Sequence, residues 1–198
     1  MSNTGHVLLI SNKNNQPHIF LIQETNKHWG IFGGKEEEKD SKSLVNTAIR
    51  ELHEESLGSL KGHKHLFSYL NHFSYKGMGK EGITNHQTFI TVNSRIAESD
   101  ISVDNPNQDQ GFGDIKNGKF FPLSLVLETI FSGGSDFVFD SEKHRLRYLF
   151  AKAIKKNQGF LYPLFQAENL DAIEARHHLL NVHPVVSTPL AMVSSKIK

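Results

Sequence analysis

The chain of 198 residues contains no cysteine. This absence excludes disulfides, thiolate zinc sites, iron–sulfur clusters and cysteine nucleophiles. Long hydrophobic runs are also absent: no apolar stretch approaches the ~18 residues that a membrane-spanning helix needs. The first apolar run, 7–10, is too short for the core of a signal peptide. We therefore expect a soluble, cytoplasmic protein with no membrane partner.

An excess of charge of one sign is lacking as well. Lys and Arg total 22 against 21 Asp and Glu, which gives a net charge of +1 at pH 7. A near-neutral chain is a poor candidate for coating a nucleic-acid backbone, and no aromatic–basic RNA-binding signature is evident. We therefore expect no extended nucleic-acid surface. Hydrophobic residues make up 37% of the chain, enough for a core, so wholesale disorder is excluded.

The order of the predicted elements indicates an α+β or α/β fold with a mixed sheet. Two apolar strands, 6–11 and 18–23, flank an Asn- and Lys-rich turn and predict a hairpin. Further strands are expected at 65–70, 72–75, 87–92 and 119–121, with a glycine-rich turn at 77–82. Helices are expected at 42–57, 122–130, 141–155 and 167–180, and a long polar loop at 99–114.

A cluster of glutamates on the first predicted helix carries the chemistry. Glu51, Glu54 and Glu55 stand at i, i+3 and i+4, so they share one helix face with Cβ atoms ~5–6 Å apart. Three carboxylates this close repel one another unless a cation lies between them, and oxygen ligands suit magnesium or manganese rather than zinc. A merely solvated acidic face is the alternative. The upstream Gly33-Gly34 and the internal Arg50 favour the metal site.

The stretch from Trp29 to Gly58 resembles the Nudix box of the Nudix hydrolases. That box has a glycine, five residues, a glutamate, seven residues, and then Arg-Glu-apolar-x-Glu-Glu-x-Gly-apolar. Its opening glycine and its core are matched here by Gly34, Arg50, Glu51, Leu52, Glu54 and Glu55. The resemblance implies an α/β/α sandwich with a loop–helix–loop metal site. It also implies magnesium-dependent hydrolysis of a phosphoanhydride bond in a nucleoside diphosphate linked to another group.

The resemblance also implies roles for single residues. Glu51, Glu54 and Glu55 would bind magnesium, with manganese as a substitute, Arg50 would orient the carboxylates, and Gly34 would allow the tight loop.

A second motif lies further along the chain. The sequence Phe-Phe-Pro-Leu at 120–123 resembles a strand-to-helix junction of the family. In many members an acidic residue shortly before it acts as general base or extra metal ligand. Asp114 stands in that loop, and a solvated aspartate is the alternative. The implied catalytic set is Arg50, Glu51, Glu54 and Asp114.

The box departs from the family pattern at three points. Gly34 to Arg50 spans sixteen positions where the family has fourteen, Lys42 falls at the upstream glutamate, and Leu57 takes the place of the closing glycine. Asp40, or one of the acidic residues 36–38, would have to replace that glutamate. These departures motivate an alternative function: a Nudix-fold nucleotide-binding or regulatory module with weakened or lost turnover.

Two aromatic residues are candidates for substrate binding together with Gly34. Trp29 could stack on a base or pack against the sheet. Tyr75 lies about where Nudix hydrolases of diadenosine polyphosphates often carry a tyrosine, with core packing as the alternative.

The expected organisation is a Nudix hydrolase domain over 1–157 and a helical extension over 158–198 that packs on the domain or on a partner subunit. The expected partner is a nucleotide-type small molecule, and many relatives pair as homodimers.

Overall fold

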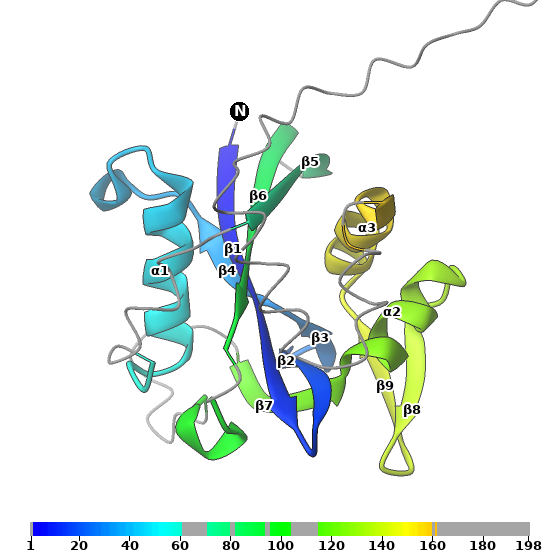
Figure 1. Cartoon of the computed structure of the whole chain (residues 1–198). Helices are drawn as coiled ribbons and strands as arrows, with labels where there is room; N and C mark the ends of the chain where they lie inside the picture. Colours follow the sequence, from blue (N-terminus) through cyan, green and yellow to red (C-terminus); the bar gives the residue numbers. More distant parts are fainter. Residues whose placement is uncertain are drawn as a thin grey trace, which may run out of the picture.

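The computed structural model describes residues 2–60, 71–79, 82–93, 96–103, 115–159 and 161. Within these ranges, nine strands form one mixed sheet. Helix α1 (Leu44–Glu55) covers one face, and helices α2 (Leu123–Phe131) and α3 (Tyr148–Lys156) cover the other (Figure 1). This is the predicted α/β/α sandwich. The predicted strand at 65–70, the predicted helix at 167–180, Asp114 and nearly all of the extension 158–198 lie outside the described residues.

Strand β1 (Ser2–Lys13) runs through the middle of the sheet. It forms the predicted antiparallel hairpin with β2 (Gln16–Glu24), and the turn residues Asn14 and Asn15 have positive φ angles of 54° and 60°. It also pairs in parallel with β6 (Gly82–Val92) and antiparallel with β4 (Phe32–Lys35). Because β4 pairs with the start of β1, the glycine pair 33–34 lies beside the sheet centre.

The remaining strands extend the sheet on both sides. They are β3 (His28–Gly30), β5 (Asn71–Gly79), β7 (Ile115–Pro122), β8 (Asp136–Phe139) and β9 (Glu142–Leu146). The main path is β5-β6-β1-β2-β3-β9-β8, with β7 paired to β2. The glycine-rich turn expected at 77–82 is narrower than predicted, because β5 continues to Gly79 and β6 begins at Gly82.

Two of the predicted helices are confirmed with small shifts at their ends. The Ser43 side chain caps α1 by accepting a hydrogen bond from the Asn46 N–H, and Pro122 precedes α2. Short 3-10 turns lie at Glu38–Asp40 (η1) and Glu98–Asp100 (η3). In the described ranges, no helix has both the length and the apolar character needed to cross a bilayer.

The prediction of a helix over 141–155 is wrong for the first half of that segment. This segment begins with strand β9, and α3 starts only at Tyr148. Buried His144 and Leu146 alternate with exposed neighbours, which is the two-residue period of a half-buried strand. Asp140 and Ser141 both have positive φ angles, 50° and 66°, and close a two-residue hairpin turn between β8 and β9.

The core has two parts because side chains of one strand point alternately to the two faces. On β1, Val7 and Leu9 pack on the α1 side, whereas Leu8 and Ile10 pack on the α2–α3 side. Burial on both faces explains why the centre of β1 reads as a continuous apolar run.

Gly5 lets α1 approach β1 closely. A Cβ atom at this position would lie 2.4 Å from the Leu44 carbonyl oxygen and 2.9 Å from the Ala48 nitrogen. We therefore expect Gly5→Ala to lower the free energy of unfolding by about 1–2 kcal/mol, because the helix backbone must shift. Urea denaturation measures this change. Gly159→Ala is the control, since an added Cβ there meets nothing within 4 Å; equal midpoints for the two variants would contradict the close packing.

Candidate active site

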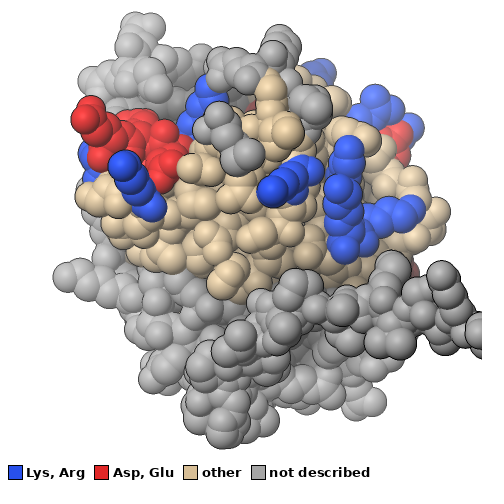
Figure 2. Space-filling model, turned by 90° about the horizontal axis from the view of Figure 1, so that it is seen from above, with Lys and Arg blue, Asp and Glu red and all other residues tan. Residues whose placement is uncertain are grey.

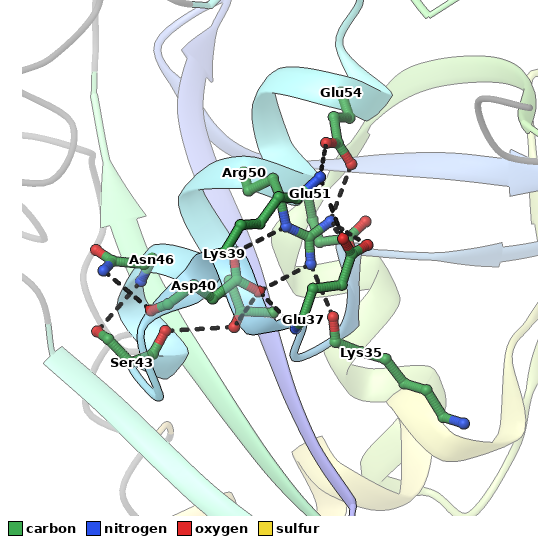
Figure 3. A network of polar contacts seen from close by, with 10 residues as sticks. Lys35, Glu37, Lys39, Asp40, Ser43, Asn46, Arg50, Glu51 and Glu54 are labelled. Carbon is green, nitrogen blue, oxygen red and sulfur yellow. Dashed lines mark hydrogen bonds and ion pairs between the residues drawn. The ribbon is translucent and has the colours of Figure 1, made fainter. Parts of the chain in front are cut away.

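Arg50 on α1 is the centre of a polar network that joins the helix to the preceding loop (Figure 3). Its Nε and Nη2 donate to the two carboxylate oxygens of Asp40 at 2.9 and 3.0 Å. Its Nη1 donates to Glu51 at 2.7 Å and to Glu54 at 2.9 Å, and Nη2 also donates to the Lys35 carbonyl at 2.7 Å. Only 11% of the Arg50 side chain is exposed, so the network fixes the guanidinium and the carboxylates around it.

Asp40 is the loop carboxylate that holds Arg50. It is buried, and it accepts further hydrogen bonds from the Glu37 N–H at 2.9 Å and the Thr47 hydroxyl at 3.0 Å. Hydrogen bonds from Arg50 lower the pKa of Asp40 to about 2, against the opposing effect of burial. Lys42, which falls at the family's glutamate position, is exposed. Of the acidic residues that could replace that glutamate, Asp40 makes the two-oxygen contact with Arg50.

Two glycines of β4 bring the sheet against the carboxylates of α1. A Cβ atom on Gly34 would lie 2.2 Å from Glu51 Oε1. The Gly33 N–H donates to Glu55 Oε2 at 2.8 Å, and Gly33 has a φ angle of 149°. A Cβ atom on Gly33 would instead meet His6 and Gly5 of β1. The lack of a side chain at Gly34 therefore allows the close approach of the sheet to Glu51, and Gly33 contributes its N–H and its positive φ angle.

Burial disfavours the charged forms of two of these carboxylates. It raises the pKa of Glu51, and the nearby Arg50 charge opposes this effect. It raises the pKa of Glu55 to about 8, although the Gly33 N–H favours the charged form. Repulsion between Glu51 and Glu55 raises the pKa of Glu55 further. A cation bound beside them would reverse this balance and keep both ionised.

The chemistry of this donor set fits a hard divalent cation, because all candidate ligands are carboxylate oxygens. The hydrogen bonds from Arg50 and Gly33 engage one oxygen of Glu51 and one of Glu55. As they stand, however, the described residues include no group of three acidic or histidine side chains placed to hold a metal ion. Glu51 and Glu54 both turn toward Arg50, while Glu55 turns toward Gly33. The donor chemistry thus supports metal binding, which stays a proposal.

A pocket of about 180 Å³ lies on the α3 side of the sheet. Strands β1, β5 and β6 form its floor, Leu149, Phe150 and Ala153 of α3 form a wall, and residues 33–35 form its edge toward α1. Ligand pockets for drug-sized molecules are usually ~300–1,000 Å³. The pocket therefore has room for one moiety of a larger ligand.

The pocket floor combines the aromatic rings of Phe73 and Tyr75 with uncharged polar side chains. The ring of Tyr75 stacks on His86 with centroids 4.4 Å apart, and Thr4 Oγ1 lies 2.6 Å from His86 Nδ1 and 2.9 Å from His6 Nε2. Burial lowers the pKa of His6 to about 3 and also lowers the pKa of His86. Both imidazoles are therefore neutral at pH 7. Sequence reasoning missed Thr4, His6 and His86 as pocket residues.

The two aromatic candidates for substrate binding lie in different places. Tyr75 lines the pocket, and burial raises the pKa of its hydroxyl to about 12. Trp29 is 2% exposed and packs edge-on against Phe121 and His144, with ring centroids 4.8 and 5.5 Å away. The structure therefore has Trp29 in the core, which was the packing alternative, and not in the pocket. Asp114 lies outside the described residues.

Three solved structures show what this fold is similar to. A MutT/nudix family protein from Enterococcus faecalis has a TM-score of 0.56 and 15% identity over 91% of this chain and 73% of that one. The NUDIX domain of Shewanella oneidensis NrtR, complexed with ADP ribose, has a TM-score of 0.52 and 17% identity over 80% and 87%. An Ap4A hydrolase from C. elegans has a TM-score of 0.51 and 13% identity over 82% and 99%.

These similarities establish the fold and nothing finer, because the identities are low. No protein-family model matches the sequence, and no curated protein matches it. The mixed sheet between α1 and the α2–α3 pair is the Nudix fold. The resemblance seen in residues 29–58 is thereby confirmed at the level of the fold.

Proposed function

We propose that this chain is a magnesium-dependent hydrolase of phosphoanhydride bonds, acting on a nucleoside diphosphate linked to another group. One observation carries the proposal. Gly33 and Gly34 line the pocket and at the same time contact the Glu55 and Glu51 carboxylates of α1. A ligand with one moiety in the pocket would thus have its next groups beside the acidic helix. The ADP ribose complex of the NrtR NUDIX domain and the Ap4A hydrolase support this substrate class by similarity of fold.

In the proposed reaction the chain places carboxylates and limits their movement. Glu51, Glu54 and Glu55 would hold magnesium, which would neutralise the diphosphate and lower the pKa of a bound water. Arg50 fixes Glu51 and Glu54 through its Nη1, and the Gly33 N–H fixes Glu55. Such positioning, combined with charge neutralisation, is most of what phosphoryl chemistry requires.

A further carboxylate would position or deprotonate the attacking water. The candidates are Asp114 and the acidic residues 36–38. Glu36 accepts a hydrogen bond from Asn3 Nδ2 at 2.8 Å, whereas Glu37 lies 3.2 Å from Lys39 Nζ and 3.4 Å from Arg50 Nη1. Both residues lie in the loop that leads from β4 to α1, the helix of the proposed metal ligands. The choice between this loop and Asp114 is left to mutagenesis.

A substrate panel tests the proposed activity. Dinucleoside polyphosphates, nucleotide sugars, ADP-ribose, capped RNA and oxidised nucleotides would each be incubated with the chain in Mg²⁺, in Mn²⁺ and in EDTA. Hydrolysis of at least one of them in Mg²⁺, abolished by EDTA, is the expected result. If no substrate is hydrolysed although nucleotides still bind, the proposed hydrolase activity is rejected.

The second candidate is a Nudix-fold nucleotide-binding module without turnover. Arg50 donates hydrogen bonds to both Glu51 and Glu54, which favours this candidate. Among the described residues, no three acidic or histidine side chains are placed to hold a metal ion. Lys42 at the family's glutamate position points the same way. Nucleotide binding without hydrolysis of any substrate in the panel would support this candidate. The cytoplasmic location and the homodimer stay predictions from the sequence.

Metal binding can be tested separately from turnover. Gly34→Ala is expected to weaken Mn²⁺ binding by about tenfold, because the new methyl group would occupy the space of the Glu51 carboxylate. The obstructing atoms belong to the end of a flexible side chain, so the chain should fold normally. Titration of the metal-free chain with Mn²⁺ measures the affinity, and Gly159→Ala serves as control. Equal affinity in the wild type and Gly34→Ala would remove Glu51 from the proposed ligands.

A further inference from the structure

Arg147 is a basic residue of the pocket lining. It lines the same pocket as Gly33 and Gly34, whose neighbours on α1 are Glu55 and Glu51. Its charge adds to burial in lowering the pKa of His6 on the pocket floor. The guanidinium is therefore close enough to the pocket to act on a charged group bound there.

Two contacts fix Arg147 without using up its donors. Its N–H donates to the Trp29 carbonyl at 2.7 Å, at the junction of β9 and α3. Its Nη1 lies 2.6 Å from Glu24 Oε1, and 41% of the side chain is exposed. A guanidinium has five N–H donors in a planar fork that matches phosphate oxygens. The contact with Glu24 engages one nitrogen and leaves the fork available to an anion.

The other two arginines that the structure describes are engaged elsewhere. Arg50 is 11% exposed and donates from all three nitrogens, among others to Asp40 and Glu51. Arg145 makes a two-bond contact with Asp136, with Nε and Nη2 at 2.7 and 3.1 Å, on the β8–β9 hairpin. Neither arginine lines the pocket. Among the described arginines, Arg147 is thus the one placed to meet a bound ligand.

An anionic ligand needs a positive charge at the pocket, and the basic residues that line it are Arg147 and Lys35. Of these two, only the arginine has a planar fork of donors that matches a phosphate. The pocket floor is neutral at pH 7, and acidic side chains gather to one side of the face shown in Figure 2, with separate lysines and arginines across the rest of it. Without a cation, a phosphate beside the glycine pair would meet the Glu51 and Glu55 carboxylates. We propose that Arg147 binds the phosphate that joins the pocket-bound moiety to the rest of the ligand, and so selects phosphorylated ligands over neutral ones.

This inference rests on the proposed nucleotide ligand but not on turnover, so it is tested by binding. Calorimetric titrations with AMP and with adenosine would be made in EDTA, on the full chain and on Arg147→Gln. We expect Arg147→Gln to weaken AMP binding by about tenfold, because a charge-assisted two-bond contact is lost, and to leave adenosine binding unchanged. Arg147→Lys keeps the charge without the fork and should fall between the two.

Arg145→Gln is the matched control, since it removes the same group two residues earlier, on strand β9 and outside the pocket lining, and should change neither affinity. Equal AMP affinity in the wild type and Arg147→Gln would overturn the assignment, as would an equal loss for AMP and adenosine. Absence of AMP binding to the wild type would also overturn it. A substrate panel without turnover, combined with selective loss of AMP binding in Arg147→Gln, would reject the hydrolase and leave this role of Arg147 standing.

Discussion

Replacing Glu54 by glutamine is expected to lower turnover by about two orders of magnitude or more, with little change in stability. Glu54 is one of the three proposed metal ligands, and glutamine removes the charge that a divalent cation requires. The side chain is 32% exposed and accepts hydrogen bonds from Arg50 at 2.9 Å and from Lys39 at 3.2 Å. The amide oxygen of glutamine can still accept one of these bonds. The measurement is kcat at saturating Mg²⁺ on the substrate that the panel identifies.

The matched control for this experiment is Glu128→Gln. Glu128 is exposed on α2, on the opposite face of the sheet from α1, and undergoes the same chemical change. Its turnover should equal that of the wild type. Near-normal turnover of Glu54→Gln at saturating Mg²⁺ would exclude Glu54 from the metal site. A lowered melting temperature in Glu54→Gln alone would show instead that its contact with Arg50 is mainly structural.

The helix that carries the candidate site could be predicted because its signals are local. The apolar period around Ala48 and Leu52 sets the buried face of α1, and both side chains are fully buried against the sheet. The spacing of the glutamates then places them beside that face whatever the rest of the chain does. The first hairpin was predictable for the same reason, since its strands are joined by a short turn.

The residue that replaces the family's upstream glutamate could only be narrowed to Asp40 and the acidic residues 36–38 from the sequence, and the contact of Asp40 with Arg50 was not predicted. The choice depends on η1 and on the two residues after it, Ser41 and Lys42, which have positive φ angles of 54° and 59°. Neither residue type favours this conformation. The tertiary contacts of the loop impose it, and it brings Asp40 under the guanidinium. Sequence spacing relative to the family pattern carries no information on that turn.

The pocket could not be predicted because its floor joins strands that are distant in the sequence. Thr4 and His86 are 82 residues apart, and they meet only because β1 pairs in parallel with β6. A parallel pairing has no local turn signal, unlike a hairpin. Arg147 was missed for a related reason: the segment around it was predicted as one helix, which hid the junction of β9 and α3 that places its side chain.

Asp40→Asn is expected to lower the free energy of unfolding by about 3 kcal/mol at pH 7. Asp40 is buried, and both of its oxygens accept hydrogen bonds from Arg50. The asparagine side chain has the same shape, but it leaves the Arg50 guanidinium, whose side chain is 11% exposed, without the carboxylate that accepts from two of its nitrogens. Urea denaturation at constant ionic strength measures the change. Asp136→Asn is the control, because Asp136 pairs with Arg145 at an exposed position and should contribute little.

The pH dependence of this difference tests its electrostatic origin. The pKa of Asp40 is about 2 in the folded chain and close to 3.8 in the unfolded chain. A carboxylate with a lowered folded pKa stabilises the chain fully above its unfolded pKa, and this contribution is lost as the pH falls through the folded pKa. The gap between wild type and Asp40→Asn should therefore be constant from pH 7 to about 5 and shrink between about pH 4 and pH 2. A gap that stays constant down to pH 2 would show that Asp40 acts through its shape and its neutral hydrogen bonds, and that the ion pair with Arg50 contributes nothing.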